Sequence, residues 1–234
     1  KDWKKLCGEL LTEATALNKV SVNKLPKDYC KKWNVFMGIG DRLRKITGQT
    51  RLVVSRIFVH LSGSEVTPML GLLTQAARNA VEADGEMKVL EECLVTVCDG
   101  LLQYDTFWRS AGNEGEVFWD EGEAADFVNE LFTDSASRYL SKLNYDDAPD
   151  EDLLALPPTG NLVVMLTVAY EGELDTLETN LADYEALKEA LRSLISLTYG
   201  ESLRAVQIHF SPAQLGDELT DEQVLLNFPE VVPL

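Results

Sequence analysis

Two histidines are the residues of this sequence best suited to acid–base chemistry near neutral pH. His60 and His209 each fall near the end of an apolar run that predicts a β-strand. If these strands are neighbours in a sheet, the two rings could approach each other and mark an enzyme or small-ligand site at the strand ends. The alternative, histidines in satisfied or exposed structural positions, is the interpretation that the sequence favours.

Four cysteines offer a second source of chemistry. None of them belongs to a CxxC pair, and Cys93 and Cys98 lie five residues apart on a predicted helix, where they point in different directions. With only two histidines in the chain, a zinc site is not expected. Cys7, Cys30, Cys93 and Cys98 are therefore interpreted as free thiols of a reducing compartment, and no metal or other cofactor is expected.

Motifs for phosphate binding and nucleophilic catalysis are missing from the sequence. Gly38-Ile39-Gly40 lacks the third glycine of a dinucleotide fingerprint, because Leu43 stands in its place, and no predicted strand precedes it. The patterns GxxxxGK[ST], HExxH and GxSxG do not occur. The sequence thus predicts no catalytic residues, and a non-enzymatic protein is the favoured interpretation.

Acidic side chains gather around two aromatic residues, Phe118 and Trp119. Their spacing does not match the calcium loop of an EF-hand, so a docking surface is the functional reading, with Glu116, Phe118, Trp119 and Asp120 as its candidate contacts. The alternative is a solvated acidic loop over 112–123 whose aromatic rings pack on the core.

Charge is unevenly divided along the chain. The net charge is −18, yet residues 1–56 hold 13 lysines and arginines against 5 acids, and the rest holds 8 against 34. An acidic body repels phosphate backbones, so nucleic acid is not an expected partner. The basic segment could fold back on this body, dock on another acidic protein, or contact an anionic membrane surface. Its candidate contacts are Trp3, Lys4, Lys5, Lys31, Lys32 and Trp33.

The length of 234 residues suits one large domain, or a main domain with a smaller appendage. No apolar run approaches the roughly 20 residues that span a bilayer, so no transmembrane segment is expected in this chain. Because the chain begins with Lys1, the sequence leaves open whether an anchor or targeting segment was removed. We expect an intracellular location.

The elements that must position these residues predict an α+β fold. Residues 1–50 form a basic, helical segment, and residues 51–234 form an acidic α+β domain. Strands are predicted at about 51–61, 161–170 and 203–210, in a small sheet of three or more strands covered by helices. Within the domain we distinguish a helical block (65–143), an acidic, proline-containing linker (145–159) and a β-α-β part (160–234). A helix is predicted from Glu123 to Leu143, and Thr220 with Gln223 predicts a capping box.

Three stretches resemble a known family. They are RLVVSRIFVHL with the two helices that follow it, NLVVMLTVAYEGEL, and the tail LRAVQIHFSPAQLGDELTDEQVLLNFPEVVPL. Over residues 51–234 the chain resembles domain-of-unknown-function family 1517 of cyanobacteria and chloroplasts, which includes fluctuating-light-acclimation proteins. The resemblance implies a photosynthetic organism and a role near thylakoids, in the cytoplasm or stroma. It carries no catalytic residues, and the membrane segment that often precedes the matching region has no counterpart in residues 1–50.

These observations favour a non-enzymatic accessory protein that binds another protein, for which a photosynthetic complex is the candidate. An enzyme or ligand-binding protein with a site at the strand ends is one alternative. Peripheral attachment to an anionic membrane through the basic N-terminal helix is another.

Overall fold

The computed structural model describes residues 50–138, 160–213 and 217–234. The basic segment, with Trp3, Lys4, Lys5, Lys31, Lys32 and Trp33, lies outside the described residues, and so does the linker predicted over 145–159.

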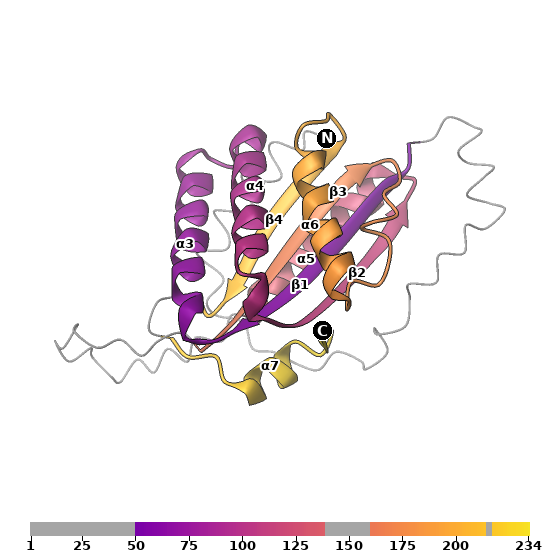
Figure 1. The fold of residues 1–234 in the computed structure, drawn as a ribbon. Helices are drawn as coiled ribbons and strands as arrows, with labels where there is room; N and C mark the ends of the chain where they lie inside the picture. The colour runs from indigo at the N-terminus through magenta and orange to yellow at the C-terminus, as the bar shows by residue number, and fades with distance from the viewer. Residues whose placement is uncertain (1–49, 139–159, 214–216) are drawn as a thin grey trace.

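One antiparallel sheet organises the described chain (Figure 1). Its strands run in the order β4-β3-β1-β2-β5, so β1 is central and pairs along its whole length with β3. The predicted α+β class and all three predicted strands are confirmed, and two further strands extend the sheet. The strands are β1 (Leu52–Ser62), β2 (Trp108–Phe118), β3 (Asn161–Glu171), β4 (Leu203–Ser211) and β5 (Val232–Pro233).

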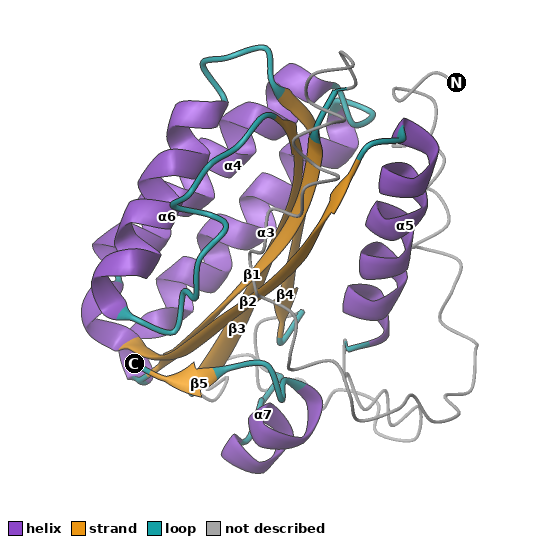
Figure 2. Ribbon diagram, turned by 90° about the vertical axis from the view of Figure 1, so that its right-hand side faces the viewer, coloured by secondary structure: helices purple, strands orange, loops and turns teal. Residues whose placement is uncertain are grey.

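Helices cover both faces of the sheet, which is why β1 and β3 are apolar almost throughout (Figure 2). Three helices pack on one face and α5 covers the other, while the short α7 lies at the foot of the layer between the sheet and α5. The helices are α3 (Thr67–Glu82), α4 (Met87–Gln103), α5 (Glu121–Ser137), α6 (Tyr184–Leu197) and α7 (Asp221–Asn227), with 3-10 turns at Ser64–Val66 and Asp105–Phe107.

Strand β2 corrects the sequence interpretation. Residues 112–123 are interpreted from the sequence as a loop within the helical block, but the chain stays extended to Phe118 and pairs with β1 from Leu52 to Leu61. The segment Gly112–Val117 is rich in glycine and glutamate, which have low strand propensity, and its pairing with the central strand overrides that preference. Helix α5 accordingly begins at Glu121 rather than Glu123, because Asp120 caps it, and it ends at Ser137.

The two faces of the sheet differ in chemistry. The face under α3, α4 and α6 holds the large apolar core. The face under α5 carries polar side chains in rows that cross the strands, because residues paired in register lie side by side on one face. One row joins Glu114, Arg56, Thr167 and Gln207, and another joins Ser110, His60, Val163 and Ser211.

Candidate functional site

Arg56 is the centre of the first polar row and is only 2% exposed. Its guanidinium forms an ion pair with Glu114 of β2 and donates to Asp134 (2.6 Å) and Ser135 (2.8 Å) of α5. Burial raises the pKa of Glu114 even though Arg56 lies beside it. The cluster therefore joins α5 to two strands by charge–charge contacts around a buried guanidinium, with Glu114 and Asp134 each about one-quarter exposed.

Arg138 extends this cluster toward the C-terminal segment. It shares Asp134 with Arg56, binds both carboxylate oxygens of Glu230 (2.7 and 2.8 Å) and donates to the carbonyl oxygen of Asn227 (3.0 Å). The Arg138 guanidinium also lies 5.5 Å from the ring of Phe58. The end of α5 is thereby joined to the end of α7, and we name this set of contacts the Arg138 clasp.

His60 lies in a chain of hydrogen bonds that links three elements. Its Nδ1 is 2.9 Å from Ser110 Oγ on β2, and its Nε2 is 3.1 Å from Asn161 Oδ1 on β3. The Asn161 amide nitrogen donates to the carbonyl oxygen of Leu219 (3.0 Å) and to the carboxylate of Asp221 (2.8 Å), at the start of α7.

This chain fixes the tautomer of His60. Both partners of the Asn161 amide nitrogen accept only, so Asn161 Oδ1 must face His60 and accept from Nε2–H. The neutral ring then presents Nδ1 as an acceptor, and Ser110 Oγ–H donates to it. Burial is the main reason that the pKa of His60 is lowered, which keeps the ring neutral.

The arrangement has the components of a serine nucleophile with its general base. Its position favours a structural role, because Ser110, His60 and Asn161 are each under 9% exposed and neither groove described below reaches them. The Asn161 contacts hold the start of α7 as the Arg138 clasp holds its end.

His209 and His60 do not lie on neighbouring strands. The sequence hypothesis required neighbouring strands, but β3 lies between β1 and β4. His209 is 5% exposed and packs edge-on against Phe132 of α5, with ring centroids 5.1 Å apart. Burial lowers the pKa of His209 to about 4, and the charge of Arg56 adds to this effect. The ring is a neutral part of the core beneath α5.

The candidate contacts around Phe118 and Trp119 are divided between different roles. Phe118 packs against Phe127 of α5, with ring centroids 5.4 Å apart, and Trp119 is half-buried. Asp120 accepts from the backbone N–H groups of Gly122 and Glu123 as the cap of α5. Glu116 is exposed on β2 and remains the member most available to a partner.

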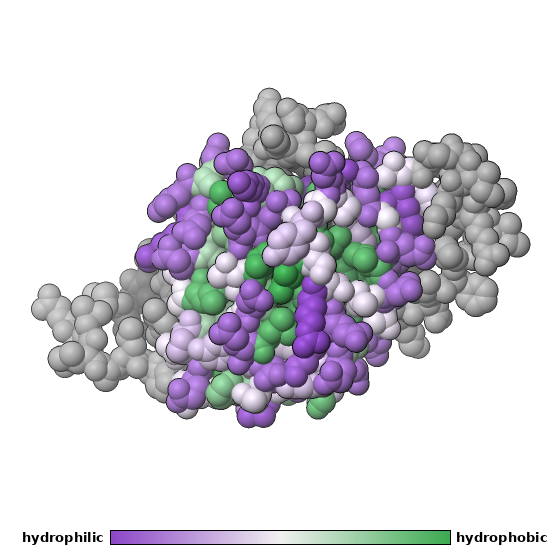
Figure 3. All heavy atoms as spheres, turned by 45° about the horizontal axis from the view of Figure 1, so that its top comes forward, coloured by the Kyte–Doolittle hydropathy of each residue, from purple (hydrophilic) through white to green (hydrophobic). Residues whose placement is uncertain are grey.

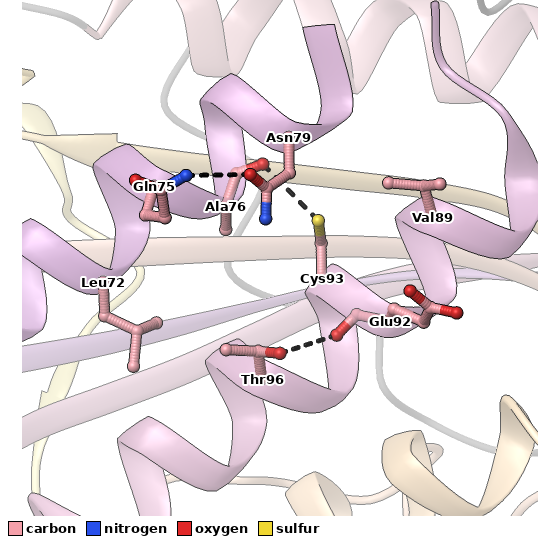
Figure 4. Close-up of a pocket in the computed structure, with 8 residues that line it drawn as sticks. All are labelled: Leu72, Gln75, Ala76, Asn79, Val89, Glu92, Cys93 and Thr96. Atoms are coloured by element: carbon pink, nitrogen blue, oxygen red, sulfur yellow. Dashed lines mark hydrogen bonds between the residues drawn. The ribbon is translucent and has the colours of Figure 1, made fainter. Parts of the chain in front are cut away.

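Two shallow grooves flank α4 on the face formed by α3, α4 and α6, where apolar residues show between polar borders (Figure 3). The groove between α3 and α4 has a volume of about 280 Å³. Its polar groups bond locally: Gln75 donates to Asn79 (2.8 Å), and the Cys93 thiol donates to the Ala76 carbonyl (3.4 Å) (Figure 4). These groups do not converge on a common point, so the groove lacks the geometry of a catalytic site.

Helix α7 carries two neighbouring exposed apolar residues that the sequence analysis missed. Its predicted capping box, Thr220 with Gln223, is confirmed. Val224 and Phe228 turn inward, whereas Leu225 and Leu226 are 76% and 75% exposed. We name these two leucines the leucine patch. The sequence does contain a signal for this patch, because Val224, Leu225 and Leu226 are consecutive apolar residues. A helix with one buried face cannot turn all three of them toward the core.

Substitution of Gly112 measures how strongly the packing of the C-terminal segment against β2 stabilises the protein. A methyl group at this position would lie 2.2 Å from the Glu230 carbonyl oxygen, so Gly112→Ala should displace the segment and cost about 1–3 kcal/mol. Amide hydrogen exchange over residues 219–234 should become faster, and urea denaturation gives the loss of stability. Gly71→Ala is the control, because nothing lies within 4 Å of that position. Equal stability of the two variants would contradict the prediction.

Within the described ranges, no group of three histidine, cysteine or acidic side chains is placed to hold a metal ion. The same part of the chain has no helix that is both long enough and apolar enough to cross a bilayer.

Comparison with known proteins adds one finding. A search of curated proteins found no match, and neither did a search of solved structures. One family model, described as "Protein of unknown function (DUF1517)", matches residues 51–234, which include every element built around the sheet. The chain therefore belongs to the DUF1517 family.

Proposed function

We propose that this chain is a non-enzymatic accessory protein that binds another protein, and that the leucine patch of α7 is the contact surface. The family resemblance favours a photosynthetic complex as the partner and a thylakoid-associated location inside the cell. The observation that carries the proposal is the pair of leucines held outward at about three-quarters exposure. Large apolar side chains that are exposed side by side are typical of interaction sites.

The leucine patch is held in place rather than left on a loose tail. Leu219, Val224 and Phe228 are buried among Phe58, Val163 and Met165. Asn161 binds Leu219 and Asp221 at one end of α7, and Arg138 binds Asn227 and Glu230 at the other. A surface fixed in this way loses little conformational entropy when a partner binds.

Charge around the patch indicates the chemistry of the partner. No lysine or arginine follows Arg204, and five acids lie within eight residues of the leucines. We name these acids the acidic rim: Asp217, Glu218, Asp221, Glu222 and Glu230. A segment with an apolar stripe and basic flanks is complementary to such a surface, so we propose a cationic amphipathic helix of the partner.

Capture from a native cell extract tests this function. Leu225→Ser combined with Leu226→Ser should reduce retention of the specific partner at least about tenfold, because losing the burial of two leucines exceeds the 1.4 kcal/mol that corresponds to that factor. Val81→Ser is the matched control, since Val81 is a 64% exposed residue on α3.

The retained protein is identified by mass spectrometry, purified and titrated against each variant at low and moderate salt. Binding should weaken as salt rises, because exposed charges are screened. Equal retention by the double variant and the wild-type chain would refute the leucine patch as the contact surface.

A further inference from the structure

We infer that, without a partner, the leucine patch is covered by residues 1–17 of the same chain. This inference rests on the proposed function, because it names an occupant of the same surface. Residues 1–17 repeat apolar side chains at helical spacing and begin with three lysines among five residues. They supply the apolar stripe and basic flank that the patch requires. Trp3, Leu6, Leu10 and Leu11 belong to the stripe, and Lys1, Lys4 and Lys5 to the flank.

Electrostatics favours this occupant. Residues 1–17 hold three lysines against three acids, but the lysines gather within the first five positions, whereas Glu9 and Glu13 lie further along; the acidic rim has no base beside it in the sequence. Asp221 is bound by Asn161 and Glu230 by Arg138, but Asp217, Glu218 and Glu222 form no ion pair with a described residue. These three carboxylates are therefore available to lysines from outside the described fold.

The chain between the two sites has a suitable length. The sheet begins at Leu52 and α7 packs at the far end of β1, beside His60, about 30 Å away at 3.3 Å per strand residue. A random-coil chain of about 34 residues, the number from 18 to 51, has a root-mean-square length of about 30 Å. Such a match gives an effective concentration on the order of millimolar, so even a weak contact would be occupied.

Other occupants fit less well. Residues 139–159 connect Arg138 to the Asn161 end of β3, both of which contact the α7 region, but they contain five acids and a single lysine, so the acidic rim repels them. A second copy of the chain would place one acidic rim against another in a symmetric contact, which is unfavourable for the same reason.

Zero-length carbodiimide cross-linking of the 234-residue chain tests the inference. The reagent joins a lysine amine to a carboxylate that it contacts, with loss of water, and mass spectrometry identifies the pair. We expect links from Lys1, Lys4 or Lys5 to Asp217, Glu218 or Glu222. They should fall at least about fivefold in the Leu225→Ser, Leu226→Ser variant, and also at 0.5 M salt, where the screening length is about 4 Å. Val81→Ser should leave them unchanged.

Mixing isotopically light and heavy chains separates contacts within one chain from contacts between copies. Links confined to like-labelled pairs support the inference. Mixed-label links, links from Lys142, or links that persist in the leucine variant would each overturn it.

Partner capture distinguishes failure of the inferred contact by residues 1–17 from failure of the proposed binding function. If the occupant competes with the partner, Lys4→Glu with Lys5→Glu should increase capture several-fold. Missing cross-links together with loss of capture in the leucine variant would reject the occupant and retain the function. Cross-links together with undiminished capture in that variant would reject the function and retain the occupant.

Discussion

Replacing Arg56 with methionine will destabilise the protein by about 3 to 5 kcal/mol, a large part of the total stability of an ordinary domain. The reason is the Glu114 carboxylate, which faces Arg56 across the β1–β2 pair and would lose its fully buried counter-charge while being only 23% exposed itself. Asp134 is affected less, because Arg138 also binds it. Urea denaturation followed by circular dichroism measures the loss.

Two further variants separate charge from packing in the Arg56 prediction. Adding Glu114→Gln to Arg56→Met removes the stranded carboxylate, so the double variant should be more stable than Arg56→Met alone. Arg204→Met is the surface control, since Arg204 pairs with Glu171 at 2.7 Å while both side chains are one-third exposed. It should cost less than about 1 kcal/mol. If Arg56→Met is as mild as Arg204→Met, the buried cluster contributes little to stability.

Acid will destabilise this protein well before its ordinary carboxylates titrate. The folded-state pKa of His209 is about 4, below the usual 6.5, so the unfolded chain binds a proton first as the pH falls. The contribution of neutral His209 to the free energy of unfolding is therefore fully present above about pH 6.5 and declines toward pH 4. A difference of 2.5 pH units corresponds to about 3 kcal/mol at the acid end of this window. The lowered pKa of His60 adds a loss of the same sign.

Denaturation midpoints at pH 7, 6 and 5 measure this effect. His209→Gln should flatten the profile over that range, because glutamine has no proton to gain. His60→Gln should flatten it as well, and it should also speed amide exchange in α7, since the bond to Asn161 is altered. A wild-type slope in His209→Gln would show that another group controls the acid response. Glu114 is the natural candidate for an opposing trend, because its raised pKa favours folding as protons bind.

The strands that the sequence predicts share one property. The runs in β1, β3 and β4 are apolar because helices cover both faces of the sheet, and composition alone reveals that. Strand β2 has no such signature, since Gly112 and Gly115 alternate with polar residues in it. Its conformation comes from pairing with residues that lie 47 to 66 positions away in the sequence, so no local pattern could predict it.

The polar sites follow the same logic. His60 stands out by residue type, but its partners Ser110 and Asn161 become visible only once the sheet order is known. Arg56 is hidden within an apolar run and looks like a solvent-facing residue of a strand. The leucine patch is hidden differently, because the capping box sets where α7 begins, whereas buried Phe228 decides which side of the helix faces the core.

The polar row through Arg56 has a consequence for how the chain reaches its native pairing. Neighbouring strand residues point to opposite faces, so sliding β1 by one residue would carry Arg56 from the α5 side into the apolar layer beneath α3, α4 and α6. There the guanidinium would meet no carboxylate, and its burial would be prohibitive. The same slip would separate His60 from Ser110 and Asn161, so Arg56 and His60, which share this face of a mostly apolar strand, select the native alignment during folding.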